Sequence, residues 1–492
     1  MKPVLVIGAG PVGMTMASEL ARYGVPVRII DKAAQRTDKS KALVLWSRTL
    51  ELLDRGGGSD PFVNAGCKAV AVNFIAGDKA IGRVSMENVQ SPFPYALMLP
   101  QSETERLLEE RLSRLGVRVE RQVELTAFKS DVDGVQAVLR HGDGQEETVS
   151  TDWLLGCDGA HSIVRHGVGA PFTGETMNSD WILADVHMTG YPCSDAEASV
   201  YWHRDGVFVI FPISPGRYRV LADLPATGAE HPPTPTLKQA QAVIDRRGPG
   251  GLKAFDPIWL AGFRINGRKV SSYRWGRVFL SGDAAHVHSP AGGQGMNTGM
   301  QDAFNLAWKL ALVVHKKCNE RLLDSYSPER SFVGDEVLKA AGRLTAIGTM
   351  RNPVAQSVRN FVGHVMLGLS PFQHAFADTM TEITIGYPKS PLNGPSLNGT
   401  GPKPGARVVP IAGQAPVGSG NTPLFALFAQ KTQATVDLVS KFGGLIDPNI
   451  RPPIHAGQIC LVRPDGYVAC CASDGDAVAL YLAGLVQPSV QS

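Results

Sequence analysis

The sequence predicts an α/β protein that contains a parallel sheet, an inserted antiparallel sheet and a separate C-terminal α/β domain. Three observations support this fold class. The chain opens with an apolar strand, a glycine-rich turn and a helix; residues 181–224 alternate between apolar and polar side chains; and a stretch rich in proline and glycine, residues 386–413, precedes a last α/β pattern. A chain of 492 residues is long enough for about three domains of average size.

The first strand, turn and helix have the order that a dinucleotide site needs. Residues 4–7 predict a buried strand, residues 8–13 read Gly-x-Gly-x-x-Gly, and residues 14–23 predict a helix. A second strand, residues 27–30, ends at Asp31. An acid at the tip of the second strand is typical of dinucleotide-binding folds, although a glycine turn also occurs in unrelated α/β proteins.

The three glycines and the acid have separate expected roles. Gly8 permits the tight turn, Gly10 lets the backbone approach a pyrophosphate, and Gly13 allows the helix to pack closely on the strand. The helix N-terminus offers free N–H groups to the phosphates. Asp31 is expected to accept hydrogen bonds from ribose hydroxyls, and its charge disfavours a 2′-phosphate, which favours FAD or NAD over NADP at this site.

Further elements follow in order along the chain. Leucines at helical spacing predict an amphipathic helix over residues 103–115. Strands are expected over residues 117–128 and 135–139, and a Gly-Asp-Gly turn at 142–144 indicates a hairpin before the short strand at 153–155.

The second half resumes the parallel pattern after the inserted sheet. We expect a strand over residues 277–280, a long helix over about 298–317 and helical structure to about residue 384. Beyond the stretch rich in proline and glycine, strands at 459–462 and 467–471 and a helix at 475–484 complete the prediction.

Composition excludes several classes of function. Hydrophobic residues make up 43% and charged residues 19%, and the formal net charge of +3 is too small to indicate a nucleic-acid partner. No apolar stretch approaches the roughly 18 residues of a membrane-spanning helix, and the N-terminus enters a strand without the pattern of a signal peptide. We therefore expect a cytoplasmic protein that contacts neither nucleic acid nor membrane.

The seven cysteines include no C-x-x-C pair and no zinc-like spacing, so we expect no metal, no disulfide framework and a reducing compartment. For the neighbouring Cys470 and Cys471, two buried thiols are favoured over a disulfide between them.

Two further motifs specify the dinucleotide. Residues 156–165 read GCDGAHSIVR, and residues 282–297 read GDAAHVHSPAGGQGMN. With these motifs and the first glycine turn in this order, the chain resembles the FAD-dependent aromatic hydroxylases, the single-component class A flavoprotein monooxygenases, over about residues 1–385. The resemblance implies a Rossmann-type FAD-binding domain formed by residues 1–175 and 271–385, with an inserted substrate domain at 176–270.

The resemblance also implies roles around the flavin ring. Asp283 follows a predicted strand and is expected to bond the ribityl chain of FAD. The flavin loop, residues 290–297, leads into a helix whose N-terminal N–H groups, from Gly295, Met296 and Asn297, are expected to face the flavin N1–C2=O edge and stabilise the reduced flavin. Pro290 and Gly293 are placed where oxygen transfer occurs, and no catalytic base is assigned.

For some of the other expected cofactor contacts, a purely structural role is an alternative. Asp158 is expected near the pyrophosphate, and Gln101 either contacts the cofactor or simply begins a helix. Lys41 stands where many relatives have an arginine, and Arg48 either compensates for that change or is a charge on a helix face. The complete predicted cofactor set is Gly8, Gly10, Val12, Gly13, Asp31, Lys32, Lys41, Arg48, Gln101, Asp158, Asp283, Pro290, Gly293, Gly295, Met296 and Asn297.

After a linker at residues 386–399, residues 400–492 resemble the thioredoxin-like extension of phenol and polyketide hydroxylases. The extension lacks C-x-x-C, so thiol exchange is not expected and its role is assigned to packing or dimer contact.

The resemblance implies a monooxygenase that takes electrons from transient NAD(P)H and uses O2 to hydroxylate a small aromatic substrate, phenolic or polycyclic and polyketide-like, through a flavin C4a-hydroperoxide. Alternatives are a Baeyer–Villiger or epoxidising enzyme on the same scaffold and a flavin-binding protein without catalysis. The Gly-Trp-x-Trp-x-Ile-Pro stretch of flavin-dependent halogenases is absent from the sequence. We expect a monomer or homodimer.

Overall fold

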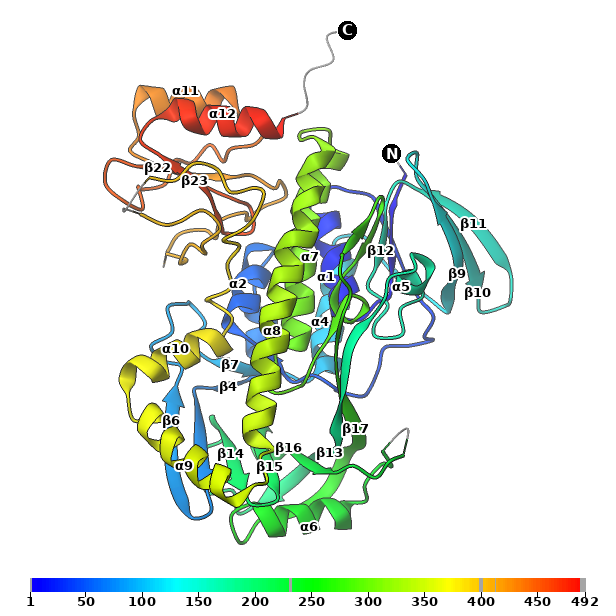
Figure 1. Ribbon diagram of the computed structural model, residues 1–492. Helices are drawn as coiled ribbons and strands as arrows, with labels where there is room; N and C mark the ends of the chain where they lie inside the picture. The colour runs from blue at the N-terminus through cyan, green and yellow to red at the C-terminus, as the bar shows by residue number, and fades with distance from the viewer. Residues whose placement is uncertain (1, 230–231, 398–400, 412, 487–492) are drawn as a thin grey trace.

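The glycine-rich turn at the N-terminus belongs to a six-stranded sheet (Figure 1). The computed structural model describes residues 2–229, 232–397, 401–411 and 413–486. Neighbouring strands are parallel except at one edge, where β18 is antiparallel to β19. In spatial order the strands are β18 (Arg274–Trp275), β19 (Val278–Leu280), β12 (Leu154–Gly156), β1 (Val4–Ile7), β2 (Val27–Asp31) and β8 (Val119–Arg121).

Three helices pack together beside this sheet. Helix α1 (Pro11–Arg22) contacts both α4 (Gln101–Arg114) and α7 (Gly295–Val314). Helix α1 begins at Pro11, before the expected residue 14, because proline is tolerated at the first helical position. Helix α7 begins at Gly295, not at residue 298, so the end of the glycine-rich loop, residues 295–297, forms the first turn of the helix.

A mixed sheet of eight strands forms the lower part of the molecule in Figure 1. Its central strands come from the segment that alternates between apolar and polar residues. Strands β5, β6 and β20 come from outside residues 176–270, so the sheet also uses segments assigned to the first domain. The strand order is β20 (His286–Val287), β17 (Lys253–Lys269), β13 (Thr173–Thr189), β16 (Arg217–Pro225), β15 (Gly206–Ser214), β14 (Glu197–His203), β5 (Ala71–Ala76) and β6 (Lys79–Ser85).

The two faces of this sheet have different neighbours. On one face Tyr201 and Phe208 are buried in a cluster with α6 (Leu237–Arg247). Trp202 and Phe211 are only partly buried and belong to a different cluster, together with residues near the flavin loop. The alternation in the sequence thus separates a core face from a face directed toward the first domain.

Smaller elements complete the first domain. The hairpin expected around residues 142–144 is present in a three-stranded sheet, and Gln122, with φ of 56°, divides the strand expected over 117–128 into two. The remaining strands are β9 (Val123–Ser130), β10 (Val135–His141), β11 (Glu146–Thr151), β3 (Val44–Leu45), β4 (Cys67–Ala69) and β7 (Ala96–Met98). Short helical segments are α2 (Ser47–Arg55), α3 (Asp60–Ala65), α5 (Ile163–Gly167), η1 (Gly282–Ala284) and η2 (Glu320–Ser325).

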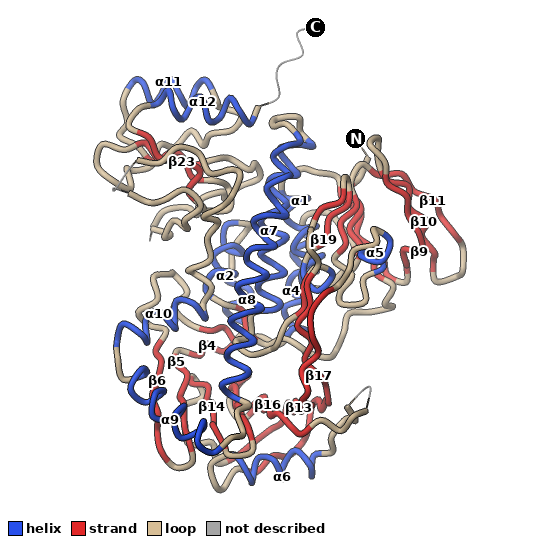
Figure 2. Tube along the Cα trace, in the orientation of Figure 1, coloured by secondary structure: helices blue, strands red, loops and turns tan. Residues whose placement is uncertain are grey.

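Helix α8 (Tyr326–Gly348) runs from the parallel sheet toward the eight-stranded sheet, and α9 (Pro353–Leu367) and α10 (Ser370–Met380) follow it (Figures 1 and 2). No helix in the described part of the chain is both long and apolar enough to cross a membrane.

The C-terminal domain has a three-stranded antiparallel sheet and two helices that lie side by side (Figure 2). Tyr387 and Leu392, in the predicted linker, are buried, so this segment packs against the protein. The likeness to thioredoxin remains a prediction. The elements are β21 (Ala426–Phe428), β22 (Ile459–Val462), β23 (Val468–Ala472), α11 (Gln433–Lys441) and α12 (Gly475–Leu485).

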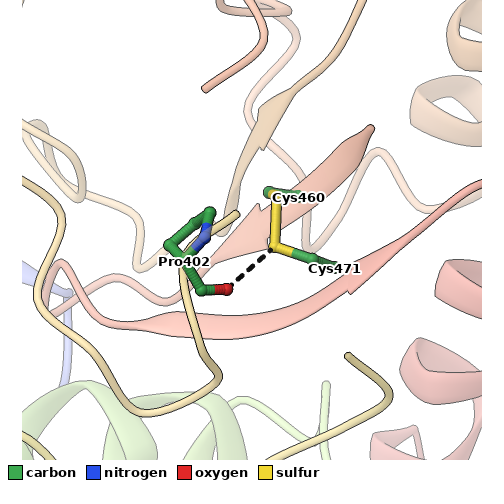
Figure 3. The surroundings of a disulfide bond; sticks show 3 residues. All are labelled: Pro402, Cys460 and Cys471. Carbon is green, nitrogen blue, oxygen red and sulfur yellow. Dashed lines mark hydrogen bonds between the residues drawn. A yellow bond between two sulfur atoms is a disulfide. The ribbon is translucent and has the colours of Figure 1, made fainter. Parts of the chain in front are cut away.

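The cysteine prediction is wrong for two residues. Cys460 and Cys471 form a disulfide between β22 and β23, while Cys470 is a buried free thiol (Figure 3). The antiparallel register places these two residues directly opposite each other, with Cα atoms 4.2 Å apart. A pair brought together by strand register has no C-x-x-C spacing, so the sequence pattern missed it. The expectation of a reducing compartment loses this support.

Buried charges join the C-terminal domain to α7 and α8. The turn between β22 and β23 carries Arg463, which is 0% exposed and bonds both oxygens of Glu329 on α8, at 2.6 and 3.0 Å. Arg463 also bonds Asp465, and Lys309 on α7 bonds Glu329 at 2.7 Å. Although burial opposes ionisation, Arg463 and Lys309 hold the pKa of Glu329 well below its usual range. This hairpin is therefore part of the core.

Candidate functional site

The glycine turn has the close packing that its sequence predicts. Gly8 has φ of 96°, and a Cβ atom there would lie 2.5 Å from the carbonyl oxygen of Cys157. A Cβ on Gly13 would lie 1.9 Å from the carbonyl oxygen of Gly8, so only glycine lets α1 approach the turn this closely. Around Gly10 a Cβ would meet nothing within 4 Å, which leaves this backbone open to a ligand.

The carboxylate of Asp31 closes the glycine turn against β2. Its two oxygens accept the backbone N–H groups of Ala9 at 2.7 Å and Ala33 at 2.8 Å. The side chain is half-buried, and the following Lys32 is exposed. Each oxygen retains a lone pair that could accept a further hydrogen bond.

Asp158 lies after β12, beside the same turn. One oxygen accepts the N–H of Val164 at 3.2 Å, while Oδ1 is buried with no hydrogen-bond partner among the described residues. Burial raises the pKa of Asp158. The cap of α5 is Ser162, whose hydroxyl accepts the N–H of Arg165, so Asp158 is not needed for that role alone.

Asp283 and Lys41 come from distant segments and lie close enough to interact. The Asp283 side chain is exposed, yet the surrounding protein raises its pKa, while His286 and Lys41 act in the opposite direction. The adjacent Gly282 N–H donates to Asp302 on α7 at 2.9 Å. This contact holds the turn that carries Asp283 against α7.

The flavin loop is held in place by side chains of the first domain. Gly292 and Gly293 have φ of 90° and 63°, a conformation that glycine adopts without strain. The indole N–H of Trp46 donates to the carbonyl of Gly292 at 2.9 Å. The side chain of Asn297 donates to the carbonyls of Gly293 and Val44 and accepts the backbone N–H of Trp46. Asn297 therefore joins the loop to β3.

The N-terminus of α7 presents free donors at this loop. The side chain of Gln294, which precedes the helix, does not cap it, and the first helix N–H with an acceptor is that of Thr298, which donates to the carbonyl of Gln294. Within the described chain, no acceptor meets the backbone N–H groups of Gly295, Met296 and Asn297. Uncapped donors at the positive end of a 20-residue helix form a site for a negatively charged group.

Two predicted cofactor residues, Val12 and Gln101, have side chains that contact other parts of the protein. Val12 packs close to Gly282 and Gly299, between α1 and α7. The amide of Gln101 accepts the N–H of Ala42 and donates to Glu105. These two side chains therefore bridge elements of the first domain.

Arg48 is buried in α2 and faces the C-terminal domain. Its guanidinium bonds Glu51 and the carbonyl of Asp465 and lies over the ring of Tyr467, at 4.7 Å from the ring centroid. The Arg48 side chain therefore lies in the interface with the C-terminal domain.

Of the two histidines of the loop segment, His286 is buried and His288 is half-buried. His286 bonds Asp302 at 2.7 Å, and Asp302 also bonds Arg330 at 2.6 Å. Burial, with His286 nearby, lowers the pKa of His288 to about 4, so His288 is neutral near pH 7. His286 thus contacts α7 through Asp302, and His288 contacts the carbonyl of Ser289, just before the flavin loop.

An aromatic group reaches the flavin loop from the eight-stranded sheet. Trp202 and Phe74 have ring centroids 5.6 Å apart, and Phe376 on α10 lies 5.9 Å from Phe74. Met380 in the same cluster lies beside Gly292, where a Cβ would be 3.2 Å from its methyl group. These partly exposed side chains form a wall suited to a planar apolar ligand.

A cavity of about 700 Å³ lies where α8 ends beside β13 and β16. Thr345 contributes to its wall, and the Thr345 hydroxyl bonds that of Ser289, next to Pro290, at 2.7 Å. Arg351 is at its rim, bonded to the buried Asp223. The volume is within the range of pockets that hold drug-sized molecules.

Observations at separate points fit a bound FAD. The backbone at Gly10 is open, an oxygen of Asp158 is buried without a partner, and the first turn of α7 has unused donors. All three are features that a phosphate-containing flavin would satisfy. In the described ranges, no group of three or more His, Cys, Asp or Glu residues is placed to hold a metal ion.

Comparison with known proteins agrees with this geometry. The FAD binding domain family model matches residues 1–341. The 6-methylpretetramide 4-monooxygenase of Streptomyces rimosus is 39% identical over 79% of this chain and 70% of its own length. A flavin-dependent monooxygenase of Mycobacteroides abscessus is 32% identical over 98% of this chain and 100% of its own length. The solved structure of the OxyS anhydrotetracycline hydroxylase from Streptomyces rimosus has a TM-score of 0.80 at 27% identity and covers 99% of both chains.

The fold and the site define a flavoprotein oxygenase with one dinucleotide-binding domain. The chain belongs to the FAD binding domain family. It is an FAD-dependent monooxygenase of the aromatic hydroxylase type and uses NAD(P)H as electron donor.

One supporting residue of the site, Arg219, was not predicted from the sequence. Arg219 is buried on β16, bonds Asp185, and donates to the carbonyls of Ser40 and Lys41, so it anchors the segment beside Asp283. A charged residue in an otherwise buried alternating strand is the one feature that could have indicated it.

Proposed function

We propose that the chain binds FAD between the glycine turn and α7 and hydroxylates a polycyclic, polyketide-like aromatic substrate with NAD(P)H and O2. The observation that carries this proposal is the uncapped N-terminus of α7, where the N–H groups of Gly295, Met296 and Asn297 have no acceptor in the described chain. Negative charge that collects on a flavin ring during reduction is stabilised by such donors. When bound, FAD supplies hydride acceptance and oxygen transfer, which no side chain can perform.

The cofactor set follows from this placement. The open backbone at Gly10 and the N-terminus of α1 receive the pyrophosphate, and Asp31 accepts hydrogen bonds from a ribose. Asp283 bonds the ribityl chain, with Lys41 near it, and Asp158 uses its unpaired oxygen near the phosphates. Lys32 is exposed close to the ribose end.

The remaining predicted cofactor residues lie around the flavin ring or support the cofactor site from within the protein. Pro290, Gly293 and Gly295 surround the isoalloxazine, and Met296 and Asn297 contribute backbone donors. Gly8 and Gly13 shape the turn. Val12, Gln101 and Arg48 support the site through contacts within the protein.

Size and surface chemistry support a polycyclic substrate. The cavity at the end of α8, of about 700 Å³, is larger than a single phenolic ring requires. The aromatic wall of Phe74, Trp202 and Phe376, which does not line that cavity, offers a separate surface that can stack on fused rings. Similarity to enzymes named for pretetramide and anhydrotetracycline points the same way. The chain orients the ring and excludes water, so that reducing equivalents go to product and not to peroxide.

The experiment follows NADH and NADPH oxidation by the purified yellow protein, with and without phenols and polycyclic quinones, and records peroxide and product mass together. We expect a polycyclic compound to stimulate oxidation and to yield a product heavier by one oxygen atom. Oxygen inserted into a ring to give a lactone would identify a Baeyer–Villiger enzyme, and an epoxide would identify the epoxidising alternative. Tightly bound FAD with no stimulation by any compound would favour a flavin-binding protein without catalysis. A cytoplasmic location and a monomeric or homodimeric state remain part of the proposal.

A further inference from the structure

A buried glutamate with an unusual backbone conformation lies beneath the N-terminal turns of α7. Glu382 is 0% exposed, and its φ of 62° is a left-handed conformation that costs a glutamate energy. Such a conformation persists in a folded protein only where surrounding contacts impose it. The contacts that hold Glu382 in this conformation therefore indicate what the residue does.

The segment that carries Glu382 clamps the start of α7. The carbonyl of Thr379 accepts a hydrogen bond from the side chain of Gln294, the residue before α7, at 3.3 Å. The carbonyl of Thr381 accepts the backbone N–H of Arg48 at 3.2 Å. Residues 379–382, which we name the clamp segment, thus connect the flavin loop with α2.

The Glu382 carboxyl itself contacts the first turns of α7. One oxygen accepts the hydroxyl of Thr298 at 3.4 Å, and the other accepts the amide N–H of Gln301. The amide oxygen of Gln301 is buried and has no donor in the described chain. A protonated carboxyl has a hydrogen to donate, whereas a carboxylate can only accept, and the Glu382 carboxyl meets only two neutral donors among the described residues, Thr298 and Gln301.

The cations near Glu382 are each bonded to another acid, so neither forms an ion pair with the Glu382 carboxylate. Arg330 on α8 and Arg48 on α2 are the cations that act on it. Arg330 is already bonded to Asp302 at 2.6 Å, and Arg48 is bonded to Glu51 at 2.9 Å. Burial outweighs these cations and the hydrogen bonds, and it raises the pKa of Glu382 to about 8.

We propose that Glu382 is a positioning residue whose carboxyl must be protonated for α7 to stabilise the reduced flavin fully. This proposal rests on the placement of the flavin ring at α7 under the proposed function. A neutral Glu382 leaves the positive end of the helix unopposed, whereas a buried carboxylate beside the first turns would cancel part of that field. Where Glu382 is ionised, hydride transfer from NAD(P)H to the flavin adds negative charge to the site, and the carboxylate takes one proton from solvent.

The test measures the midpoint potential of the bound flavin from pH 6.5 to 9.5 in the native enzyme and in Glu382→Gln, which keeps the shape and the neutral charge. We expect the two curves to run in parallel below pH 7. Above about pH 8 the flavin of the native enzyme should become harder to reduce than the flavin of E382Q. The equilibrium constant for flavin reduction in the native enzyme, divided by that in E382Q, should fall by up to about tenfold for each further pH unit. Identical curves over the whole range in two enzymes that both hold FAD would overturn the proposal.

Two further measurements separate charge from structure. Glu382→Gly relieves the left-handed backbone but removes the carboxyl, so its flavin should lack the same pH-dependent step while the free energy of unfolding changes independently. Infrared difference spectra of the native enzyme at pH 9 should gain a protonated carboxyl band on flavin reduction, and the absence of that band would contradict the proposal even if the variants failed to fold. The product mass of the native enzyme reports on the proposed function separately.

Discussion

Replacing Arg463 by methionine tests whether the C-terminal hairpin is part of the core of the flavin domain. The Arg463 side chain is fully buried and makes two hydrogen bonds to Glu329 and two to Asp465, at 2.6–3.0 Å. Removing one partner of a buried ion pair costs about 3–5 kcal/mol, because the remaining charge stays buried. Glu329 would keep its ion pair with Lys309 at 2.7 Å, whereas the Asp465 carboxylate would keep the hydrogen bond from the indole N–H of Trp308 at 3.1 Å and no ion pair within the described chain. We therefore expect a loss of about 4 kcal/mol at neutral pH.

The pH dependence gives this prediction a distinct signature. The pKa of Glu329 is held below its unfolded value of 4.5, so its ion pairs stabilise the native protein above that pH and are progressively lost as the pH falls below it. Arg463→Met should raise the pKa of Glu329. The difference in stability between native protein and variant should therefore be largest near pH 7 and should narrow below about pH 4.5.

Urea denaturation followed by flavin and tryptophan fluorescence would measure this difference at each pH. The matched control is Arg246→Met, which removes an exposed ion pair to Asp205 and should cost less than about 1 kcal/mol. The double variant Arg463→Met, Glu329→Gln should recover part of the loss, because it leaves fewer buried charges unpaired. An R463M protein within 1 kcal/mol of native at pH 7, with an unchanged pH profile, would refute this account of domain docking.

Further predictions concern the cofactor site, the disulfide and the aromatic wall. Asp283→Ala should weaken FAD binding at least about tenfold, as measured by FAD released on gel filtration, and a yellow variant with normal turnover would count against its role. Gly13→Ala should lower the free energy of unfolding by about 1–3 kcal/mol in thermal denaturation, because its new methyl group would lie 1.9 Å from the carbonyl oxygen of Gly8. Cys460→Ser should cost about 3 kcal/mol in urea, since the disulfide closes a loop with a separation of 11 residues, and dithiothreitol should cause the same loss in the native protein. Trp202→Ala should raise the KM for substrate and the fraction of NAD(P)H that yields peroxide, and unchanged coupling would contradict the stacking role.

Patterns within short segments predicted much of the fold, including the elements that carry the candidate cofactor residues. The glycine turn with Asp31, the strand before Asp283 and the loop before α7 each carry their meaning in adjacent residues, so strand, turn and helix could be placed from the sequence. The alternation in residues 181–224 predicted the antiparallel sheet for the same reason.

Contacts between distant segments were beyond such patterns. The Cys460–Cys471 bond depends on strand register, and Arg48 reaches a carbonyl of the C-terminal domain that no local rule associates with α2. Glu382 had no signal at all, because its importance comes from a backbone conformation and from contacts with Gln301 on another helix. Asn297 was predicted as a source of a backbone donor, yet its side chain also bridges the loop to β3.

The mixed sheet has a consequence for how the chain folds during synthesis. Strand β5 pairs in parallel with β14, with Ala71 opposite Glu197, so β5 and β6 leave the ribosome long before their partner exists. At about 5–20 residues per second, the nascent chain must keep this early hairpin unpaired along one edge for several seconds or longer. An unpaired edge that waits for a distant strand is prone to association with other chains. We expect a chaperone that shields residues 71–85 to increase the yield of folded enzyme. Slower translation, which lengthens the exposure of this edge, and exchange of this hairpin alone between relatives should both reduce the yield.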